Sequence, residues 1–155
     1  MNDSEDLFAS SDGNGRISGL ARLASAAVVG VEAIPVEVEV NTTETEEDTF
    51  SPSIVGLPDA AVRESVDRVG TALSNSGLAT PFQMRWLINL APADLRKEGP
   101  SFDLPIALGT LASLGALNAT ALEGILAVGE LALSGNVRRV RGILPIALRA
   151  KEMGI

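Results

Sequence analysis

The chain has 155 residues, 46% hydrophobic and 21% charged, which suits a single domain with a buried aliphatic core. It contains no Cys and no His, so disulfides, thiolate zinc sites, His-ligated metals and Ser-His-Asp triads are excluded. The net charge of −8 is uneven: residues 1–50 hold eleven acids against Arg16 and Arg22, whereas residues 51–155 are nearly neutral. Such a chain is a poor nucleic-acid binder as a whole, although its second part leaves room for a local basic surface.

The N-terminal part is predicted to be a tail followed by a folded domain. Residues 1–19 are rich in Ser, Asp, Asn and Gly without periodicity, which predicts a disordered acidic tail and an ordered domain over residues 20–155. The first residues lack the apolar segment of a secretory signal. Residues 104–122 carry no charge, but Gly109 and Gly115 interrupt them, so we expect a buried helix rather than a membrane span. We therefore expect a cytoplasmic protein without a membrane partner.

Two strands and a charged loop come next in the chain. Residues 25–33 and 34–41 are predicted to form a strand pair, with Pro35 near the start of the second strand. In that strand three valines at every second position alternate with Glu37 and Glu39, which is typical of a half-buried strand. The acidic segment 42–50 lacks the ligand spacing of a calcium loop, so a solvated loop is expected.

The remaining elements alternate between strands and helices. Val62, Val66, Val69 and Leu73 recur at helical spacing and predict an amphipathic helix whose outer face carries Arg68 and its charged neighbours. The other predicted elements are a strand at 53–57, a helix at 58–76, a strand at 83–90, a helix at 102–117, a hairpin at 125–133 and 136–140, and a helix at 143–153. This order predicts an α+β fold, a mixed sheet with helices mainly on one face.

The segment between the strand at 83–90 and the following helix is a candidate functional loop. A loop at the start of a helix exposes backbone N–H groups that stabilise an anion or a developing oxyanion. The alternative interpretation is structural: Ser101 caps the helix, Gly99 and Pro100 form a turn, and the charges are solvated. The candidate residues are Asp94, Arg96, Lys97, Glu98, Gly99 and Ser101.

Basic residues gather near the C-terminal end of the sequence. Arg is well suited to phosphate recognition, so these residues are a candidate DNA or phosphate surface, with a solvated basic face as the open alternative. They are Arg138, Arg139, Arg141, Arg149 and Lys151. No phosphate-loop motif occurs anywhere, so this chain is not expected to bind ATP tightly.

Three motifs occur in an order that resembles one known family. They are Ile54-Val-Gly-Leu-Pro-Asp-Ala-Ala-Val62, the stretch from Asn89 through Lys97-Glu-Gly-Pro-Ser101 to Pro105, and Gly129-Glu-Leu-Ala-Leu133 with Arg141-Gly-Ile-Leu-Pro145. From Leu20 to its end, the chain resembles the N-terminal domain of the magnesium-chelatase-like AAA+ ATPases, the family of YifB and the competence protein ComM. The tail and the acidic loop are outside this resemblance.

The resemblance implies a fold and a wider protein. The fold would be that of Lon-type protease domains and of a ribosomal protein domain. An AAA+ module that binds ATP and Mg would follow after residue 155, in a protein similar to the hexameric helicases that drive DNA branch migration. The expected partners are therefore the chain's own AAA+ module and neighbouring subunits of a hexamer, with DNA as a further candidate. No metal or cofactor is expected within residues 1–155.

The resemblance to Lon-type proteases also indicates which residues would be needed for catalysis. It places Ser101 at the nucleophile position, and Leu144 where Lon-type proteases carry a lysine base. The chain has two lysines, Lys97 and Lys151, and neither is at that position. A serine hydroxyl is inert without a base to accept its proton. We therefore predict a non-catalytic accessory domain. The alternatives are a Lon-like serine hydrolase that uses Ser101, or a chelatase-type or chaperone partner domain that binds protein.

Overall fold

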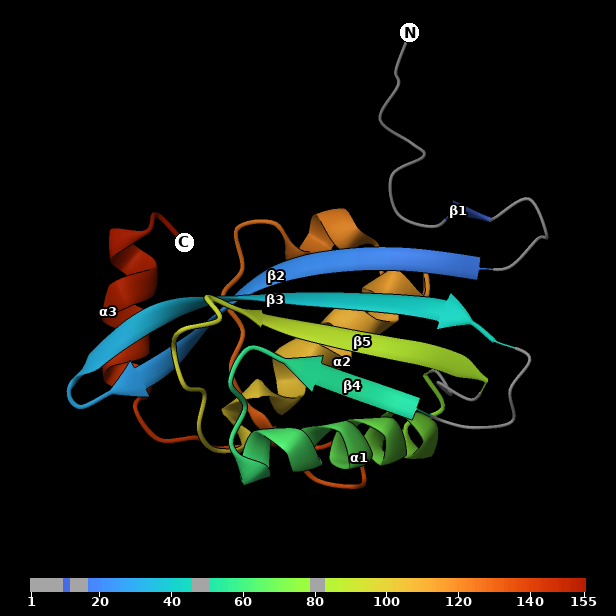
Figure 1. Cartoon of the computed structure of the whole chain (residues 1–155). Coiled ribbons are helices and arrows are strands. Elements are labelled where there is room, and N and C mark those ends of the chain that lie inside the picture. Colours follow the sequence, from blue (N-terminus) through green and yellow to red (C-terminus); the bar gives the residue numbers. More distant parts are fainter. Residues whose placement is uncertain (1–9, 12–16, 46–50, 79–82) are drawn as a thin grey trace, which may run out of the picture.

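A mixed five-stranded sheet forms the centre of the molecule (Figure 1). The computed structural model describes residues 10–11, 17–45, 51–78 and 83–155. The strands are β1 (Ser10–Ser11), β2 (Ile17–Val29), β3 (Glu32–Glu44), β4 (Ser51–Val55), β5 (Met84–Ala91), β6 (Glu130–Leu131) and β7 (Val137–Arg138). The helices are α1 (Ala60–Asn75), α2 (Asp103–Ser113) and α3 (Ile143–Glu152), with short 3₁₀ helices η1 (Pro100–Phe102) and η2 (Ala119–Leu122).

The order of strands in the main sheet is β1-β2-β3-β5-β4. Neighbouring strands are antiparallel except for β4 and β5, which are parallel because α1 connects them. β6 and β7 form a separate small hairpin. The predicted α+β class with a mixed sheet is therefore confirmed.

The β2–β3 hairpin is longer than the sequence analysis predicts. Both strands run for 13 residues, and the turn between them is at Gly30-Val31, where Gly30 has a φ of 63°. The predicted break between residues 33 and 34 is wrong, because apolar residues on both sides of the turn give no local signal of its position. Pro35 lies opposite Ala26 within the ladder rather than at a strand start.

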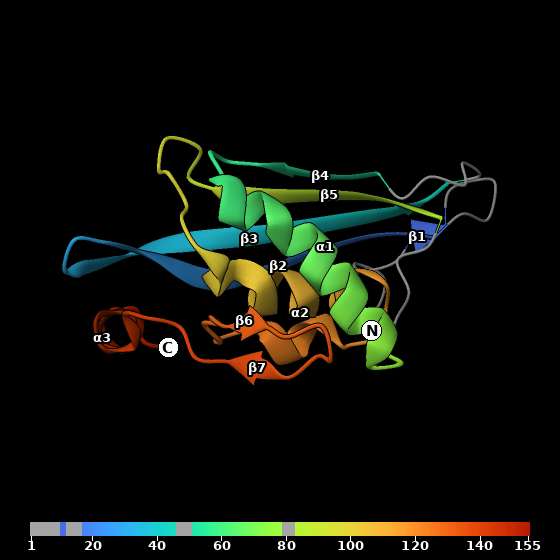
Figure 2. The same cartoon turned by 90° about the horizontal axis from the view of Figure 1, so that it is seen from below.

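Two helices cover one face of the sheet. The predicted stripe of α1 is buried, and Figure 2 shows α1 and α2 side by side against the sheet. The alternating valines of β3 point into this layer, as predicted. Gly109 allows α2 to approach closely, because a Cβ there would lie 2.7 Å from Cγ2 of Val40. Trp86 and Phe102 are fully buried in the same core.

Several predicted boundaries need correction. The sheet begins before residue 20: β1 and the first residues of β2 lie within the predicted tail, whose other residues are outside the described ranges. β3 extends through Glu44 into the predicted acidic loop, of which residues 46–50 are also outside those ranges. α2 ends at Ser113, four residues before the predicted end, and the β6–β7 hairpin is much shorter than predicted.

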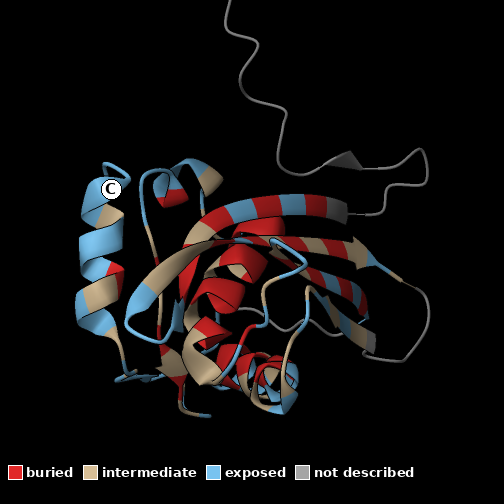
Figure 3. Ribbon diagram, turned by 60° about the vertical axis from the view of Figure 1, so that its left-hand side comes forward, coloured by how far each residue is buried: buried red, intermediate tan, exposed pale blue. Residues whose placement is uncertain are grey.

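The last helix, α3, is attached differently from the other two. It packs on β3 and β2 near the hairpin turn, and Ile146 is its one buried residue. Much of α3 is exposed in Figure 3, in contrast to α2. Leu144 is 71% exposed, so apolar side chains of this helix face solvent.

Candidate functional site: the groove beside Ser101

The candidate loop is anchored to the body of the protein through Lys97. Its backbone N–H donates to the Leu57 carbonyl at 3.1 Å, and its carbonyl accepts from the Asp59 N–H at 3.0 Å. The side chain is fully buried, and its ammonium group donates to the carbonyl of Pro92. Burial lowers the pKa of Lys97, because desolvation disfavours the charged form, and nearby Asp94 opposes this shift in part. Lys97 is therefore a structural residue that does not line the groove.

Asp59 joins the same loop to α1. Its Oδ1 accepts from the backbone N–H of Val62 at 2.7 Å, which makes Asp59 the N-cap of α1. Its Oδ2 accepts from the N–H of Gly99 at 3.2 Å. Gly99 has a positive φ of 78°, which glycine adopts without the steric cost of a Cβ atom. One carboxylate thus fixes both the start of α1 and the turn before Ser101.

An ion pair between a partly buried arginine and a buried aspartate, which the sequence analysis missed, supports the next residues. Arg68 donates from Nε to Oδ2 of Asp103 at 2.9 Å and from a terminal nitrogen to Oδ1 at 3.1 Å. Asp103 is fully buried, and its Oδ2 also accepts from the N–H of Leu131 at 3.0 Å. The carboxylate raises the pKa of Arg68. The Arg68–Asp103 pair therefore joins α1, α2 and β6, and the predicted place of Arg68 on the outer face of α1 is wrong.

Ser101 lies in a groove of about 630 Å³ at the edge of the sheet. One wall is the turn from Glu98 to Ser101, and another is formed by Ala26 and Val28 of β2. Arg139 and Arg141 follow β7 and line the same groove. The structure thus brings part of the candidate loop together with part of the candidate basic surface.

The other predicted site residues lie elsewhere. Asp94 and Arg96 are exposed and do not line the groove. Arg138 pairs with Glu130 at 3.3 Å, and Arg149 pairs with Glu152 at 2.8 Å. Lys151 is on the exposed surface of α3. The five basic residues therefore do not form one unpaired surface.

Ser101 has the accessibility of a nucleophile but not its activation. The interpretation in which it caps the helix is wrong, because η1 follows Gly99 and neither η1 nor α2 has a side-chain cap. Leu144, at the position of the expected base, is exposed at the start of α3 and cannot accept a proton. Lys97 is buried against Pro92. Within the described residues, no lysine side chain is available to Ser101.

The acids that line the groove have polar partners. Both oxygens of Asp59 accept backbone N–H groups. Glu98 forms an exposed ion pair with Arg96 at 3.2 Å, and Glu130 forms one with Arg138 at 3.3 Å. In contrast, Arg139 and Arg141 are exposed and have no ion-pair or hydrogen-bond partner in the described part of the chain. The groove therefore presents two free guanidinium groups, which suit an anionic ligand.

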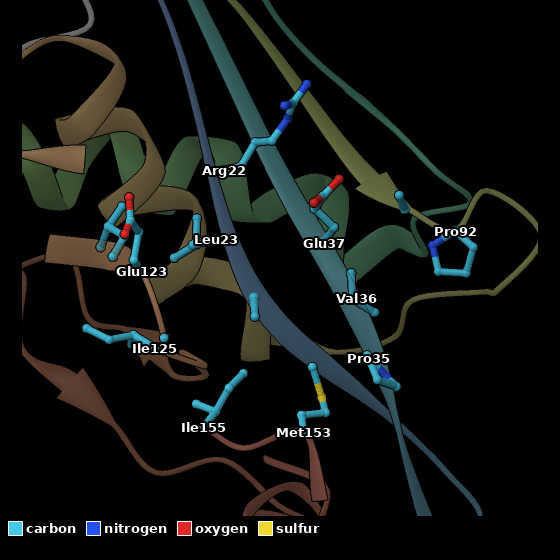
Figure 4. A pocket seen from close by; sticks show the side chains of 14 residues that line it. Arg22, Leu23, Pro35, Val36, Glu37, Pro92, Glu123, Ile125, Met153 and Ile155 are labelled. Atoms are coloured by element: carbon cyan, nitrogen blue, oxygen red, sulfur yellow. The ribbon is translucent and has the colours of Figure 1, made fainter. Parts of the chain in front are cut away.

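A second hollow of about 600 Å³ lies where the C-terminal residues approach the sheet (Figure 4). Met153, Ile155 and Ile125 contribute apolar side chains to it, and Arg22 and Glu37 are at its polar side. None of the predicted site residues lines this hollow.

Two further findings concern metal ions and membranes. In the described ranges, no group of three or more Asp, Glu, His or Cys side chains is placed to hold a metal ion. Over the same residues, no helix is both long and apolar enough to cross a lipid bilayer.

Comparison with known proteins identifies the family. Residues 37–155 match the family described as subunit ChlI of Mg-chelatase. The chain belongs to this family. It is 44% identical over 133 residues to the competence protein ComM of Haemophilus influenzae, which covers 86% of this chain and 25% of ComM.

Two other relatives match the chain with similar identity and coverage. The chain is 44% identical over 128 residues to the uncharacterized protein YifB of Escherichia coli, covering 83% of this chain and 24% of YifB. It is 41% identical over 135 residues to the uncharacterized protein Rv2897c of Mycobacterium tuberculosis, covering 87% and 26% respectively. These matches confirm the predicted resemblance. The chain spans about a quarter of the length of these relatives.

Proposed function

We propose that this chain is a non-catalytic accessory domain of a magnesium-chelatase-like AAA+ ATPase. The observation that carries the proposal is the state of the groove beside Ser101. It has an accessible serine but no lysine beside it among the described residues, because Lys97 is buried against Pro92 and Leu144 is at the position where the resemblance to Lon-type proteases expects the base. A groove of this size without an activated nucleophile is suited to binding.

The remaining parts of the proposal concern the whole protein. Family membership supports ATP and Mg binding by a part of the protein other than this domain. We propose that this domain contacts that ATPase module or a neighbouring subunit of a hexamer. We include a role near DNA, with branch migration, in the same proposal; one relative of the chain is named a competence protein.

Fewer of the predicted basic residues are available for direct DNA binding than the sequence analysis counts. Arg138 and Arg149 are paired with acids, so Arg139 and Arg141 are the two arginines that share the groove without a partner among the described residues. Each phosphate contact contributes a modest, salt-dependent part of nucleic-acid affinity. The net charge of −8 opposes the approach of DNA. These observations favour a protein ligand over DNA.

A serine-directed fluorophosphonate probe tests the non-catalytic assignment. We expect no labelling of the unmodified chain, and the same background in Ser101→Ala, because no group is placed to deprotonate the hydroxyl. Mass spectrometry of the intact protein provides the measurement, and an active serine protease in the same buffer is the positive control. Stoichiometric labelling that Ser101→Ala abolishes would favour the hydrolase alternative.

A further inference from the structure

The hollow where the C-terminal residues approach the sheet has an apolar interior (Figure 4). Its volume is about 600 Å³, close to that of the groove beside Ser101, and the two share no lining residue. The buried side chains of Leu23, Val36 and Leu122 line the hollow. It is therefore a separate concavity, of a size typical of ligand sites.

Three apolar side chains at this hollow are open to solvent. Ile125 is 42% exposed, Met153 is 41% exposed and Ile155 is 39% exposed. Ile125 follows η2 in the chain, whereas Met153 and Ile155 come directly after α3. Segments that are distant in the sequence thus present apolar surface at one place. An apolar side chain that covered this surface would remove it from water.

The charged residues that line the hollow are one arginine and two glutamates. They are Arg22, Glu37 and Glu123. The guanidinium of Arg22 is already paired, because its Nε donates to Oε1 of Glu39 at 2.8 Å. Hydrogen bonds from Asn89 and Arg22 lower the pKa of Glu39, so this partner stays ionised near neutral pH. With Glu39 included, one positive charge is set against three negative charges, a net of −2.

Glu37 and Glu123 are available to a ligand. Both are exposed, and neither forms an ion pair or a hydrogen bond with another described residue. The pKa of Arg22 is raised mainly by its hydrogen bond to Glu39, and least by the charge of Glu37. The net charge of −8 on the whole chain has the same sign as that of the hollow. The electrostatic field therefore attracts a cationic partner and repels a nucleic acid.

We infer that this hollow binds a basic peptide segment of a partner protein, with an apolar side chain in the hollow and its Lys or Arg beside Glu37 and Glu123. The inference goes beyond the proposed function, because it names a second surface and the chemistry of its partner. An uncharged apolar segment would leave the two carboxylates without a counterion, and a purely basic segment would leave the apolar side chains in water.

Methyl NMR spectra of the whole chain test where such a segment binds. The probe is a short synthetic peptide in which leucine and arginine alternate. One control peptide has glutamate in place of arginine, and the other has serine in place of leucine. We expect the probe to shift the methyl signals of Ile125, Met153 and Ile155. The signals of Leu144, which is exposed on α3 outside the hollow, should not move.

The two control peptides separate the apolar and the charged parts of the recognition. Each should bind about tenfold more weakly than the leucine–arginine peptide, because each lacks one of the two features that the hollow presents. A higher salt concentration should weaken binding of the leucine–arginine peptide, since exposed charges are screened.

Charge variants test the contribution of the glutamates. Glu37→Gln combined with Glu123→Gln should weaken binding of the leucine–arginine peptide by about tenfold, because two charge-assisted contacts are lost. The matched control is Glu64→Gln combined with Asp67→Asn, which removes the same charge from α1 and should leave the affinity nearly unchanged. Both glutamates of the hollow are exposed and unpaired among the described residues, so urea unfolding of their variant should match that of the unmodified chain.

A truncation at the hollow tests the apolar contact. Ile125→Ala should weaken binding by about fivefold, because it removes apolar surface that the partner side chain covers. Leu133→Ala is the control: Leu133 is 55% exposed but does not line the hollow, and its variant should bind normally.

Three outcomes would overturn the inference. They are no binding of the leucine–arginine peptide, equal binding of the serine–arginine peptide, and an unchanged affinity when both glutamates of the hollow are replaced. Equal binding of the serine–arginine peptide would show attraction by charge alone. Labelling of Ser101 by the fluorophosphonate would instead contradict the proposed function, and it would leave the result at this hollow unchanged, because the two sites share no lining residue.

Discussion

The loop before Ser101 and the helix α3 are held to the protein in opposite ways. The loop has a charged, turn-rich sequence, yet Lys97 is fully buried and Asp59 fixes Gly99 with its carboxylate. α3 has an apolar sequence, yet Ile146 is its one buried residue, and Leu144 is 71% exposed. Composition alone therefore does not tell which segment is anchored. The decisive contacts come from residues that are distant in the sequence.

The largest expected effect is at the buried ion pair that supports the anchored side. Asp103→Ala leaves Arg68 without its carboxylate and the N–H of Leu131 without its acceptor. We expect the free energy of unfolding to fall by about 2–3 kcal/mol, because a buried N–H loses its acceptor and a partly buried guanidinium loses its carboxylate. Urea unfolding gives the measurement.

Glu64→Ala is the control, because Glu64 is 3.6 Å from the same Arg68 but 70% exposed, and an exposed pair contributes little. Similar losses in the two variants would show that the buried junction does not hold the loop and the helices together.

A smaller, local effect is expected on the weakly held side. Ile146→Ala removes the buried anchor of α3. We expect amide exchange in α3 to accelerate by about 10-fold to 100-fold, since a truncated buried side chain costs about 2 kcal/mol, while α2 is unaffected.

Leu144→Ala, at an exposed position of the same helix, should leave exchange unchanged. If Ile146→Ala accelerated exchange in α2 as much as in α3, the two helices would open as one unit, and the contrast between the two regions would be lost.

The smallest effect is a pH dependence of the anchored loop. Burial lowers the pKa of Lys97 below its ordinary value of 10.5, so between these two values the unfolded chain binds more protons than the folded one. The free energy of unfolding should therefore rise as the pH increases through that interval. The absence of Tyr and Cys leaves few other groups that titrate there.

Lys97→Met should remove this rise, and Lys151→Met, at an exposed position of α3, should retain it. The measurement is urea unfolding at a series of alkaline pH values. A rise of equal slope in Lys97→Met would mean that another group is responsible.

Local patterns predicted the parts of the fold that depend on local spacing. The alternation in β3 and the stripe of α1 appear directly in the sequence, because burial on one face repeats with the period of the element. The turn at Gly30-Val31 was misplaced because apolar residues continue on both sides of it. Strand pairing, rather than composition, determines where such a run folds back.

The candidate site was predicted only in part for a similar reason. Arg139 and Arg141 are close in sequence, so their common place in the groove follows from the position of β7. Arg149 was grouped with them on charge alone, but the orientation of α3 pairs it with Glu152. The pair Arg68–Asp103 joins residues 35 positions apart, and no spacing rule reveals such a contact.

The buried position of Trp86 provides an intrinsic fluorescence probe of the core. Its indole is fully buried in β5, and the chain has one Trp and no Tyr. The near-ultraviolet emission of the whole molecule therefore comes from one ring between the sheet and its helices. A shift of this emission to longer wavelength reports that water has entered the core. No Tyr and no second Trp contribute overlapping emission. Local detachment of α3 should leave the Trp86 emission unchanged, because that helix is not part of the buried cluster around the indole ring.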